Sequence, residues 1–414
     1  METNNATSDY GNLREVNDFI RFIFFPVGHG SCTLVSFPPE LSEGDRIYGA
    51  IDCRDATARP IRLYLSDPWF DGEMKPSGTV YNLRFVALTH YHEDHLIGID
   101  HLLGSDNSFS HKHFLSPFPV AGEVARRSKS KPNIKKILYQ IQKLAPKPTI
   151  MKIYVDCSWL YQPKEDRLKD IFKGIAIAPP DEAFMRMREL HSQRNITPFN
   201  VLSSALRFQW GDCSVIIGGD VEDSEWQEII SDLRSKGQLH LLSSNLALCS
   251  HHGGNGNPDD LWQLISRCSS SHRQGHEAER RLSRTVIIVP CGSSREGSPS
   301  SSSLKTFFDA NSLVHCTSPA RACLGLHNGE PPSCTSYNDD LLEEQIELLP
   351  GEIAMDRSIP DLPPFVSRPV KDSNFRKGSI CVDIYPKKSP RIIYHNGVTT
   401  AEINDICSCA TKLD

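Results

Sequence analysis

The 414-residue sequence predicts an α/β fold, in which strands and helices alternate along the chain. Short runs rich in β-branched and aromatic residues recur between amphipathic helical patterns, and no internal repeat is visible. Hydrophobic residues make up 39% of the chain and charged residues 23%, which is typical of a globular protein. This length accommodates one large domain with insertions, or two domains.

The elements of the N-terminal half follow from this alternation. Strands are expected at 21–27, 33–37, 47–52, 82–90, 113–118 and 152–161. A turn at 28–32 separates the first two strands, and a helix at 96–103 follows the fourth. Residues 125–147 read as a basic loop that leads into an amphipathic helix, because apolar residues recur there at helical spacing.

The C-terminal half continues the same order. We expect strands at 174–180 and 284–292, a strand that leads into a His-Gly loop at 241–254, a hairpin at 203–220, and helices at 181–190, 223–236 and 302–311. Gly211 and Asp212 make the turn of the hairpin. Residues 324–376 are rich in Pro, Gly and acidic side chains, which favours a surface insertion with one short helix at 339–349.

The elements predict one central domain with additions at both ends. The expected units are a flexible arm at 1–18, a domain at 19–323 with a basic helical insertion within 104–200, the insertion at 324–376, and a closing hairpin and tail at 377–414.

Composition limits the classes of function. The net charge of −6 gives no global basic field, although a local basic stripe is enough for nucleic-acid binding. The N-terminus lacks a signal-peptide pattern, and no run of roughly 18 apolar residues occurs. Thirteen scattered cysteines without a CxxC pair indicate reduced thiols. These features together predict a cytoplasmic protein.

The stretch THYHEDH, residues 89–95, concentrates metal-ligand side chains at the end of a predicted strand. Imidazole nitrogens and carboxylate oxygens suit zinc or a neighbouring first-row metal. His90 and His92 share one face because side chains alternate along a strand, and the following turn directs Asp94 and His95 toward a second ion. A polar loop without metal is the plain alternative.

In this run and in the motifs on either side of it, the chain resembles the metallo-β-lactamase fold, an αββα sandwich of two mixed β-sheets flanked by helices. More narrowly, it resembles the hydrolase domain at the C-terminus of bacterial DNA-uptake competence channels. The motifs that carry the resemblance occur in order: FPVGHGSCTLVSF (25–37), AIDCR (50–54), LTHYHEDHLIGI (88–99), NVLSSALRFQWGDCSVIIGGDVED (200–223), LALCSHHGG (246–254) and IIVPCGSSREGSPSSSSLKTF (287–307).

The resemblance implies roles for residues outside the metal run. Asp220 is expected to bridge two metals, and His252 to complete the second site, with His251 facing the substrate phosphate or the leaving group. Asp52 is expected to accept a hydrogen bond from a metal-binding histidine. The plain alternatives are a turn-forming aspartate at Asp52 and a surface histidine at His251.

Two positions depart from the family pattern. Many of these hydrolases have another histidine ligand before the bridging aspartate, whereas this chain has Asn200 and Ser203 there, as the competence subgroup does. We expect a first metal site with fewer protein ligands. The competence-type loop has His-Pro where this chain has Ser298-Pro299.

The resemblance predicts a hydrolase with two divalent ions, zinc being favoured over manganese, that cleaves phosphodiesters, with DNA as the favoured substrate. Asp94 or Asp220 would orient the attacking water, and His251 would assist the departing oxygen. Alternatives are a phosphodiesterase for small molecules or cyclic nucleotides, a lactone or thioester hydrolase, and a metal-stabilised interaction module without activity.

A basic segment gives separate support for nucleic acid, although an ordinary solvated helix face explains it equally well. Tyr139 lies among these charges and can stack on a base. The arm and the insertion suggest a protein partner, such as the other components of an antiviral defence system. The candidate nucleic-acid contacts are Arg126, Arg127, Lys129, Lys131, Lys135 and Lys136.

Overall fold

The computed structural model describes the central part of the chain in separate ranges. The described residues are 19–27, 30–38, 47–65, 80–104, 109–117, 132–143, 150–153, 172–179, 183, 185, 186, 189, 199–211, 213–266, 285–290, 299–310, 312–317, 379–385, 390–395 and 400–402. The predicted arm at 1–18, the insertion at 324–376 and most of the predicted helix at 181–190 lie outside them.

One mixed sheet contains, within the described ranges, nine strands in the order β15-β14-β13-β1-β2-β3-β4-β5-β6. Strands β3 to β6 run parallel, and the other neighbours pair antiparallel. The bounds are β1 (Ile20–Phe24), β2 (Cys32–Phe37), β3 (Ile47–Cys53), β4 (Tyr81–Ala87), β5 (Phe109–Pro117), β6 (Ile150–Ile153), β13 (Ser379–Ile384), β14 (Arg391–His395) and β15 (Thr400–Glu402).

The second mixed sheet has the order β12-β11-β10-β9-β8-β7. Strands β9 to β12 run parallel, and β7, β8 and β9 pair antiparallel. The bounds are β7 (Phe172–Ala176), β8 (Leu206–Trp210), β9 (Cys213–Ile217), β10 (Leu246–Leu248), β11 (Val286–Val289) and β12 (Leu313–Cys316). The predicted hairpin is β8–β9, where Gly211 has a φ of 58°.

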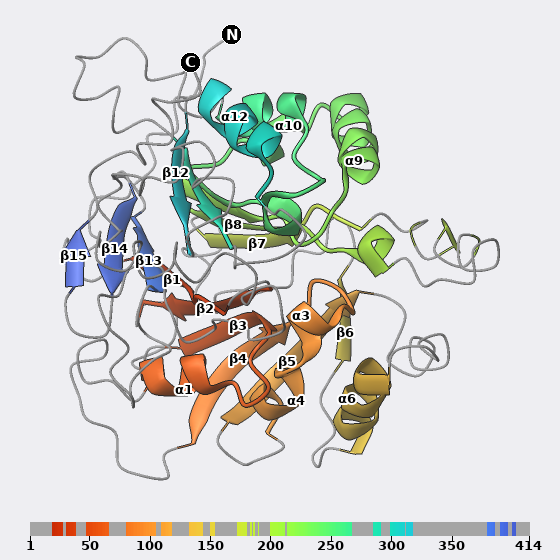
Figure 1. The fold of residues 1–414 in the computed structure, drawn as a ribbon, viewed down its shortest axis with the longest axis vertical. Coiled ribbons are helices and arrows are strands. Elements are labelled where there is room, and N and C mark those ends of the chain that lie inside the picture. The colour runs from red at the N-terminus through yellow and green to blue at the C-terminus, as the bar shows by residue number, and fades with distance from the viewer. Residues whose placement is uncertain are drawn as a thin grey trace, which may run out of the picture.

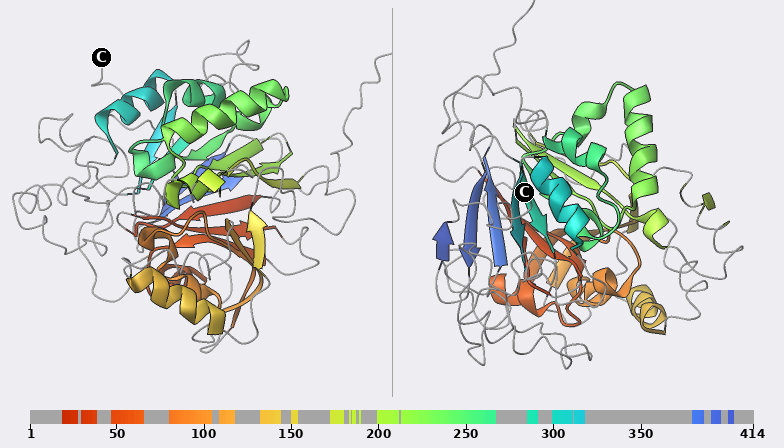
Figure 2. Two further views of the ribbon diagram at one scale, coloured as in Figure 1. Left: turned by 90° about the vertical axis from the view of Figure 1, so that its right-hand side faces the viewer. Right: turned by 45° about the horizontal axis from the view of Figure 1, so that its top comes forward.

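Helices cover the outer faces of both sheets (Figures 1 and 2). The nine-stranded sheet carries α1 (Arg59–Leu65), α3 (Glu93–Leu96), α4 (Ile99–Leu102) and α6 (Pro132–Lys143), and the other sheet carries α9 (Asp223–Ser235), α10 (Asp259–Ile265) and α12 (Ser301–Asp309). Short 3₁₀ helices are η2 (Phe199–Leu202), η3 (Leu239–Leu242) and η4 (Ser250–Gly253). The predicted αββα sandwich of two mixed sheets is confirmed.

Aromatic side chains join the two sheets. Phe208 of β8 lies between Phe22 of β1 and Phe85 of β4, with ring centroids 5.4 and 6.5 Å away, and all three are buried. A second apolar cluster lies under the helices of the nine-stranded sheet, where Ile99 of α4 and Leu138 of α6 are both completely buried. This packing holds α6 next to the helices that follow β4.

The helix predicted at 96–103 is wrong in its extent, because the chain forms two short helices, α3 and α4. Gly98 separates them, and its backbone N–H donates to Cys53 O at 2.8 Å. A Cβ at Gly98 would lie 2.0 Å from Asp55 O, so this close approach requires glycine. Helices α1 and α10 and strands β12 and β15 were not predicted, and residues 154–161 of the strand predicted at 152–161 lie outside the described residues. No helix among the described residues combines the length and apolar character needed to cross a membrane.

Candidate metal centre

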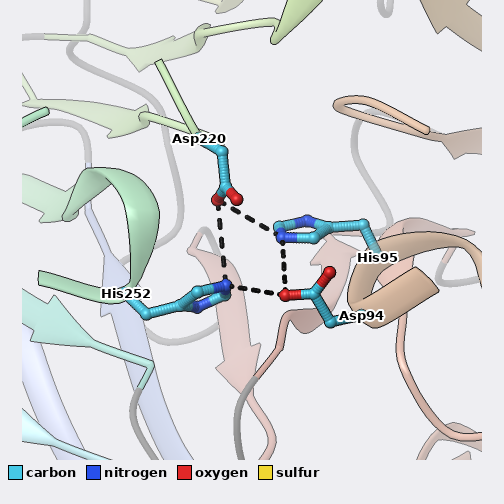
Figure 3. Close-up of side chains that lie close together, drawn as sticks. All are labelled: Asp94, His95, Asp220 and His252. Carbon is cyan, nitrogen blue, oxygen red and sulfur yellow. Dashed lines mark hydrogen bonds and ion pairs between the residues drawn. The ribbon is translucent and has the colours of Figure 1, made fainter. Parts of the chain in front are cut away.

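The carboxyl ends of four strands, two from each sheet, meet at one edge of the sandwich. Asp52 lies near the end of β3, and the run that contains His90 and His95 follows β4. On the opposite sheet, Asp220 follows β9 and His252 follows β10. Figure 3 shows side chains from both sheets converging here, as expected where parallel strands end side by side.

Asp94, His95, Asp220 and His252, which we call the four-residue cluster, offer ligand atoms that all lie within 4.8 Å of one another. Nε2 of His252 is 3.2 Å from Asp94 Oδ2 and 3.8 Å from Asp220 Oδ1. Nε2 of His95 is 3.3 Å from Asp220 Oδ1 and 3.8 Å from Asp94 Oδ2. Two nitrogens and two carboxylates at these separations form a suitable donor set for zinc.

His90, His92 and Asp220 form a second group, the three-residue cluster, with the same limit on mutual distance. Nε2 of His90 is 3.0 Å from His92 Nδ1 and 3.4 Å from Asp220 Oδ2. Asp220 therefore presents Oδ1 to the four-residue cluster and Oδ2 to the three-residue cluster. A single buried carboxylate is shared by both.

Hydrogen bonds fix which nitrogen of each histidine is free to bind a cation in the four-residue cluster. Nδ1 of His95 donates to Asp52 Oδ2 at 2.7 Å, and Nδ1 of His252 donates to Pro290 O at 3.1 Å, since a carbonyl can only accept. The Nε2 atoms are left facing the carboxylates of the cluster. His95 Nε2 and Asp220 Oδ1 are both buried and lie 3.3 Å apart. A cation bound between them would take the place of the His95 proton.

Thr89 orients the three-residue cluster, a role that was not predicted. Its backbone N–H and hydroxyl both donate to Asp52 at 2.7 Å. The hydroxyl oxygen can then only accept from His90 Nδ1, which is 3.3 Å away. Nε2 of His90 is consequently unprotonated and faces Asp220. The signal in the sequence was the position of Thr89 directly before the histidine run.

Burial and charge shift the acid–base properties of these groups together. Burial alone would lower the pKa of His95, but the carboxylates of Asp220, Asp52 and Asp94 raise it well above its ordinary value. Burial lowers the pKa of His90, and the neighbouring His95 lowers it further. Burial would raise the pKa of Asp94 and Asp220, yet the surrounding histidines hold both well below the usual range. The carboxylates are thus ionised and ready to bind a cation.

The backbone around the centre is strained in a way that positions the ligands. Asp52, His251 and His252 have φ values of 54°, 48° and 54°, which cost about 1–2 kcal/mol each for residues with a Cβ. Gly219 has a φ of 56°, and a Cβ there would lie 2.6 Å from Ser203 Oγ. That hydroxyl accepts the backbone N–H of Asp220 at 2.7 Å. Strain at several ligand-bearing turns is typical of functional sites.

The remaining predicted residues lie around the clusters in different ways. Asn200 donates through Nδ2 to Glu222 Oε1 at 2.8 Å and belongs to neither cluster. His251 Nε2 is 3.9 Å from Asp220 Oδ2, and its side chain is 27% exposed. Pro299 packs against Gly253 of the His-Gly loop, whereas Ser298 lies outside the described residues. In the described part of the chain, no third histidine joins His90 and His92 within the cluster distance.

Helix α6 carries the described part of the predicted basic segment. Lys135, Lys136 and Tyr139 are exposed, and Lys143 Nζ lies 4.2 Å from the ring centroid of Tyr139. The helix packs against α3, which contains Asp94 and His95, and against α4 (Figure 1). Arg126, Arg127, Lys129 and Lys131 lie outside the described residues.

No protein-family model and no curated protein sequence matches the chain. Similar solved structures include the metallo-β-lactamase fold protein YhfI from Bacillus subtilis, with 10% identity over 72% of this chain and 96% of that chain and a TM-score of 0.36. Zn²⁺-bound PqqB from Methylobacterium extorquens shares 12% identity over 69% of this chain and 85% of that one, with a TM-score of 0.34. A mutant of the CmlA β-hydroxylase shares 10% identity over 71% of this chain and 52% of that chain, with a TM-score of 0.35. No residue role follows from likenesses at this level.

Proposed function

We propose that this protein is a phosphodiester hydrolase that depends on two divalent ions and cleaves nucleic acid, with DNA as the favoured substrate. One observation carries the proposal: the two oxygens of Asp220 face different groups of ligand atoms, Oδ2 toward His90 and Oδ1 toward His95. A carboxylate shared in this way suits two cations held side by side. Paired cations are well suited to displacement at phosphorus.

The two clusters divide the binding of the ions between them. The four-residue cluster would hold one ion and the three-residue cluster the other. When bound, the ions supply positive charge against the developing charge on phosphoryl oxygens and make water nucleophilic at neutral pH. Asp52 and Thr89 keep Nε2 of His95 and His90 available, since they accept the Nδ1 protons.

Asp94 and His251 are partly open to solvent and thus accessible to substrate. The side chain of Asp94 is 23% exposed, and that of His251 is 27% exposed, whereas those of His95 and His252 are each 1% exposed. The carboxylate of Asp94 can accept a hydrogen bond from the attacking water. The sequence-based prediction that His251 assists the departing oxygen is compatible with this exposure.

Nucleic acid is favoured as the substrate by the position of α6. This helix presents exposed Lys135 and Lys136 and packs directly against α3, which carries two ligands of the four-residue cluster. Lysines beside a phosphodiesterase site would attract the phosphate backbone without reading its sequence. Because the net charge of the whole chain is negative, a local group of lysines beside the centre is stronger support for nucleic-acid binding.

A substrate panel tests the proposal on the full chain. The protein is stripped with a chelator, reloaded with Zn²⁺ or Mn²⁺, and incubated with plasmid DNA, single-stranded DNA, RNA, cyclic nucleotides and bis-p-nitrophenyl phosphate. We expect cleavage of DNA that disappears in Asp94→Asn, which removes one carboxylate ligand at nearly constant shape. Cleavage of only the small esters would support the alternative of a small-molecule phosphodiesterase, and no cleavage of any phosphodiester would refute the proposal.

Charge reversal on α6 tests the substrate class separately. Lys135→Glu with Lys136→Glu should weaken DNA binding and reduce the slope of log affinity against log salt by about 2, one unit for each lysine that no longer neutralises a phosphate. The matched control reverses Lys236 and Lys305, two exposed lysines on the opposite helix layer. Equal effects of the two pairs would mean that only net charge matters.

A role inside a larger assembly, such as an antiviral defence system, is part of the proposal. It depends on the arm at 1–18 and the insertion at 324–376, which lie outside the described residues. Size-exclusion chromatography of the full chain with the products of neighbouring genes would test it, and elution at the position of the isolated protein would reject it.

A further inference from the structure

The three-residue cluster has one ligand fewer than the four-residue cluster. Structural zinc sites use four protein ligands, and catalytic zinc sites use three with one open position. If Asp220 is shared by two ions, the second ion has only His90 and His92 for itself within the described residues. Such a site would bind its metal weakly unless the chain supplies a further ligand.

We propose that His251 supplies this ligand through Nε2, so that the two consecutive histidines of the His-Gly loop bind different ions. The nearest carboxylate oxygen to His251 Nε2 is Asp220 Oδ2, at 3.9 Å, which is also the oxygen that faces His90. His252 Nε2 instead lies 3.8 Å from Oδ1. The neighbouring histidines therefore face opposite sides of the bridging carboxylate.

One distance, from His251 Nε2 to Asp220 Oδ2, is close to that between two ligands of one ion, although His251 is not within 4.8 Å of every donor of the three-residue cluster. Two ligands of a tetrahedral zinc ion, each about 2.0–2.2 Å from the metal, lie about 3.3–3.6 Å apart. His90 Nε2 and Asp220 Oδ2 are already 3.4 Å apart, and His251 Nε2 is only slightly farther from that oxygen. A rotation of the partly exposed imidazole toward His90 and His92 would complete the set of ligands.

The imidazole of His251 has, among the described residues, no hydrogen bond that would compete with a metal. Nδ1 is buried and has no hydrogen bond, and the only ion pair of the ring in the described part of the chain is the one to Asp220. The backbone nevertheless holds the residue in the left-handed region with a φ of 48°, and its N–H donates to Gly219 O at 2.9 Å. A strained turn that directs such an imidazole toward the centre is consistent with a ligand role.

This inference deepens the proposed function, since it assumes that the centre holds two ions. It differs from the role that the family resemblance implies for His251, in which the imidazole contacts the substrate. A ligand changes how tightly metal is bound in the absence of substrate, whereas a residue that only protonates a departing oxygen does not. Metal binding, measured without activity, therefore separates the two roles.

The experiment titrates metal-free full-length protein with Zn²⁺ against a chromogenic chelator and repeats the titration with Co²⁺ by absorption spectroscopy. His251→Gly removes the imidazole at a position where the backbone favours glycine, so the fold should be retained. His251→Asn tolerates the same backbone and offers an amide oxygen instead. His240→Gly, at an exposed histidine on η3, is the matched control.

We expect the wild type and His240→Gly to bind two ions. His251→Gly should bind one ion normally and the other about 100-fold more weakly, with an altered Co²⁺ spectrum, and His251→Asn should fall between them. Two ions bound with wild-type affinity in His251→Gly would overturn the inference, and an effect on turnover alone would assign His251 to the substrate. If the wild type binds only one ion, the two-ion proposal itself fails, and the failure is recognised before any variant is considered.

Discussion

The four-residue cluster and the three-residue cluster share Asp220 and both use the run that follows β4, but only the four-residue cluster also takes a ligand from the end of β10. The four-residue cluster collects ligands from the ends of β4, β9 and β10, and three of its four side chains are buried. The three-residue cluster takes two ligands from the histidine run and one from the end of β9, and His92 is only partly buried. Four donors around one point suit tight binding of a cation, whereas three donors would leave one side of an ion open.

The largest effect should come from the residue common to both clusters. Asp220→Asn keeps the shape but removes a carboxylate that each position needs, so we expect both ions to be lost and kcat/KM on phosphodiesters to fall on the order of 10⁴-fold. Elemental analysis after dialysis measures the ions. Retention of one ion would show that the clusters do not share this residue as a ligand.

Replacing a ligand that belongs to only one of the clusters tests the effect of their different numbers of ligands. His92→Ala leaves two ligands in the three-residue cluster, to which the proposed His251 adds a more distant third, whereas His252→Ala leaves three ligands that are already close together. We expect excess Zn²⁺ to restore a substantial part of the activity of His252→Ala and little of that of His92→Ala, with binding weakened at least about 100-fold in both. The recovery is measured as activity across a Zn²⁺ titration of each variant. Equal recovery in the two variants would contradict the proposed difference in metal affinity between the clusters.

Asp52 positions histidines of both clusters through hydrogen bonds. Replacing it should therefore have a smaller effect on metal affinity and activity than replacing a ligand. Its carboxylate accepts hydrogen bonds from Thr89 N, Thr89 Oγ1 and His95 Nδ1. Asp52→Asn replaces one accepting oxygen with a donor, so we expect metal affinity or activity to fall about 10–100-fold.

Asp55→Asn is a suitable control for Asp52→Asn. Asp55 Oδ1 also accepts three hydrogen bonds, from Thr57 N, Thr57 Oγ1 and Arg59 N, but none from a ligand of either cluster. It should change thermal stability without changing metal affinity. A comparable loss of metal affinity in both variants would argue against a specific role for Asp52.

The smallest expected effect is the dependence of the stability of the metal-free protein on pH. His95 has a folded-state pKa well above its ordinary value of about 6.5, so the folded metal-free protein binds more protons than the unfolded chain above that pH. Its contribution to stability is complete below about pH 6.5 and is lost as the pH rises toward the raised pKa, by at most about 1.4 kcal/mol per pH unit. The lowered pKa values of Asp94 and Asp220 affect only acidic solutions.

Thermal melts of the metal-free protein from pH 6.5 upward should therefore show a falling midpoint. The stabilisation by Zn²⁺ should increase over the same range, because the metal takes the place of the His95 proton. His95→Gln should flatten the dependence in the metal-free protein. A midpoint that rises with pH in the wild type would contradict the protonated state assigned to His95.

Much of the fold was predictable from local patterns. The strands around the histidine run and the β8–β9 hairpin follow from short apolar runs and turn residues, because these preferences act over a few positions. Helix 96–103 was predicted as continuous because its break depends on Gly98 packing against Asp55, an interaction that the periodicity of the segment does not contain. Strand β12 was missed for a similar reason, since it is defined by its pairing with β11.

By itself, the sequence determined the kind of chemistry available: histidines and carboxylates crowded at the end of a strand, and an aspartate and a histidine pair at the ends of later strands. Which atoms face one another depends on how the two sheets pack. This packing directs the two oxygens of Asp220 to different clusters and turns His251 and His252 to opposite sides of that carboxylate. The physical reason is that ligand geometry depends on strand ends brought together from two sheets and on hydrogen bonds that select one nitrogen of each imidazole, and neither is encoded within a short stretch of chain.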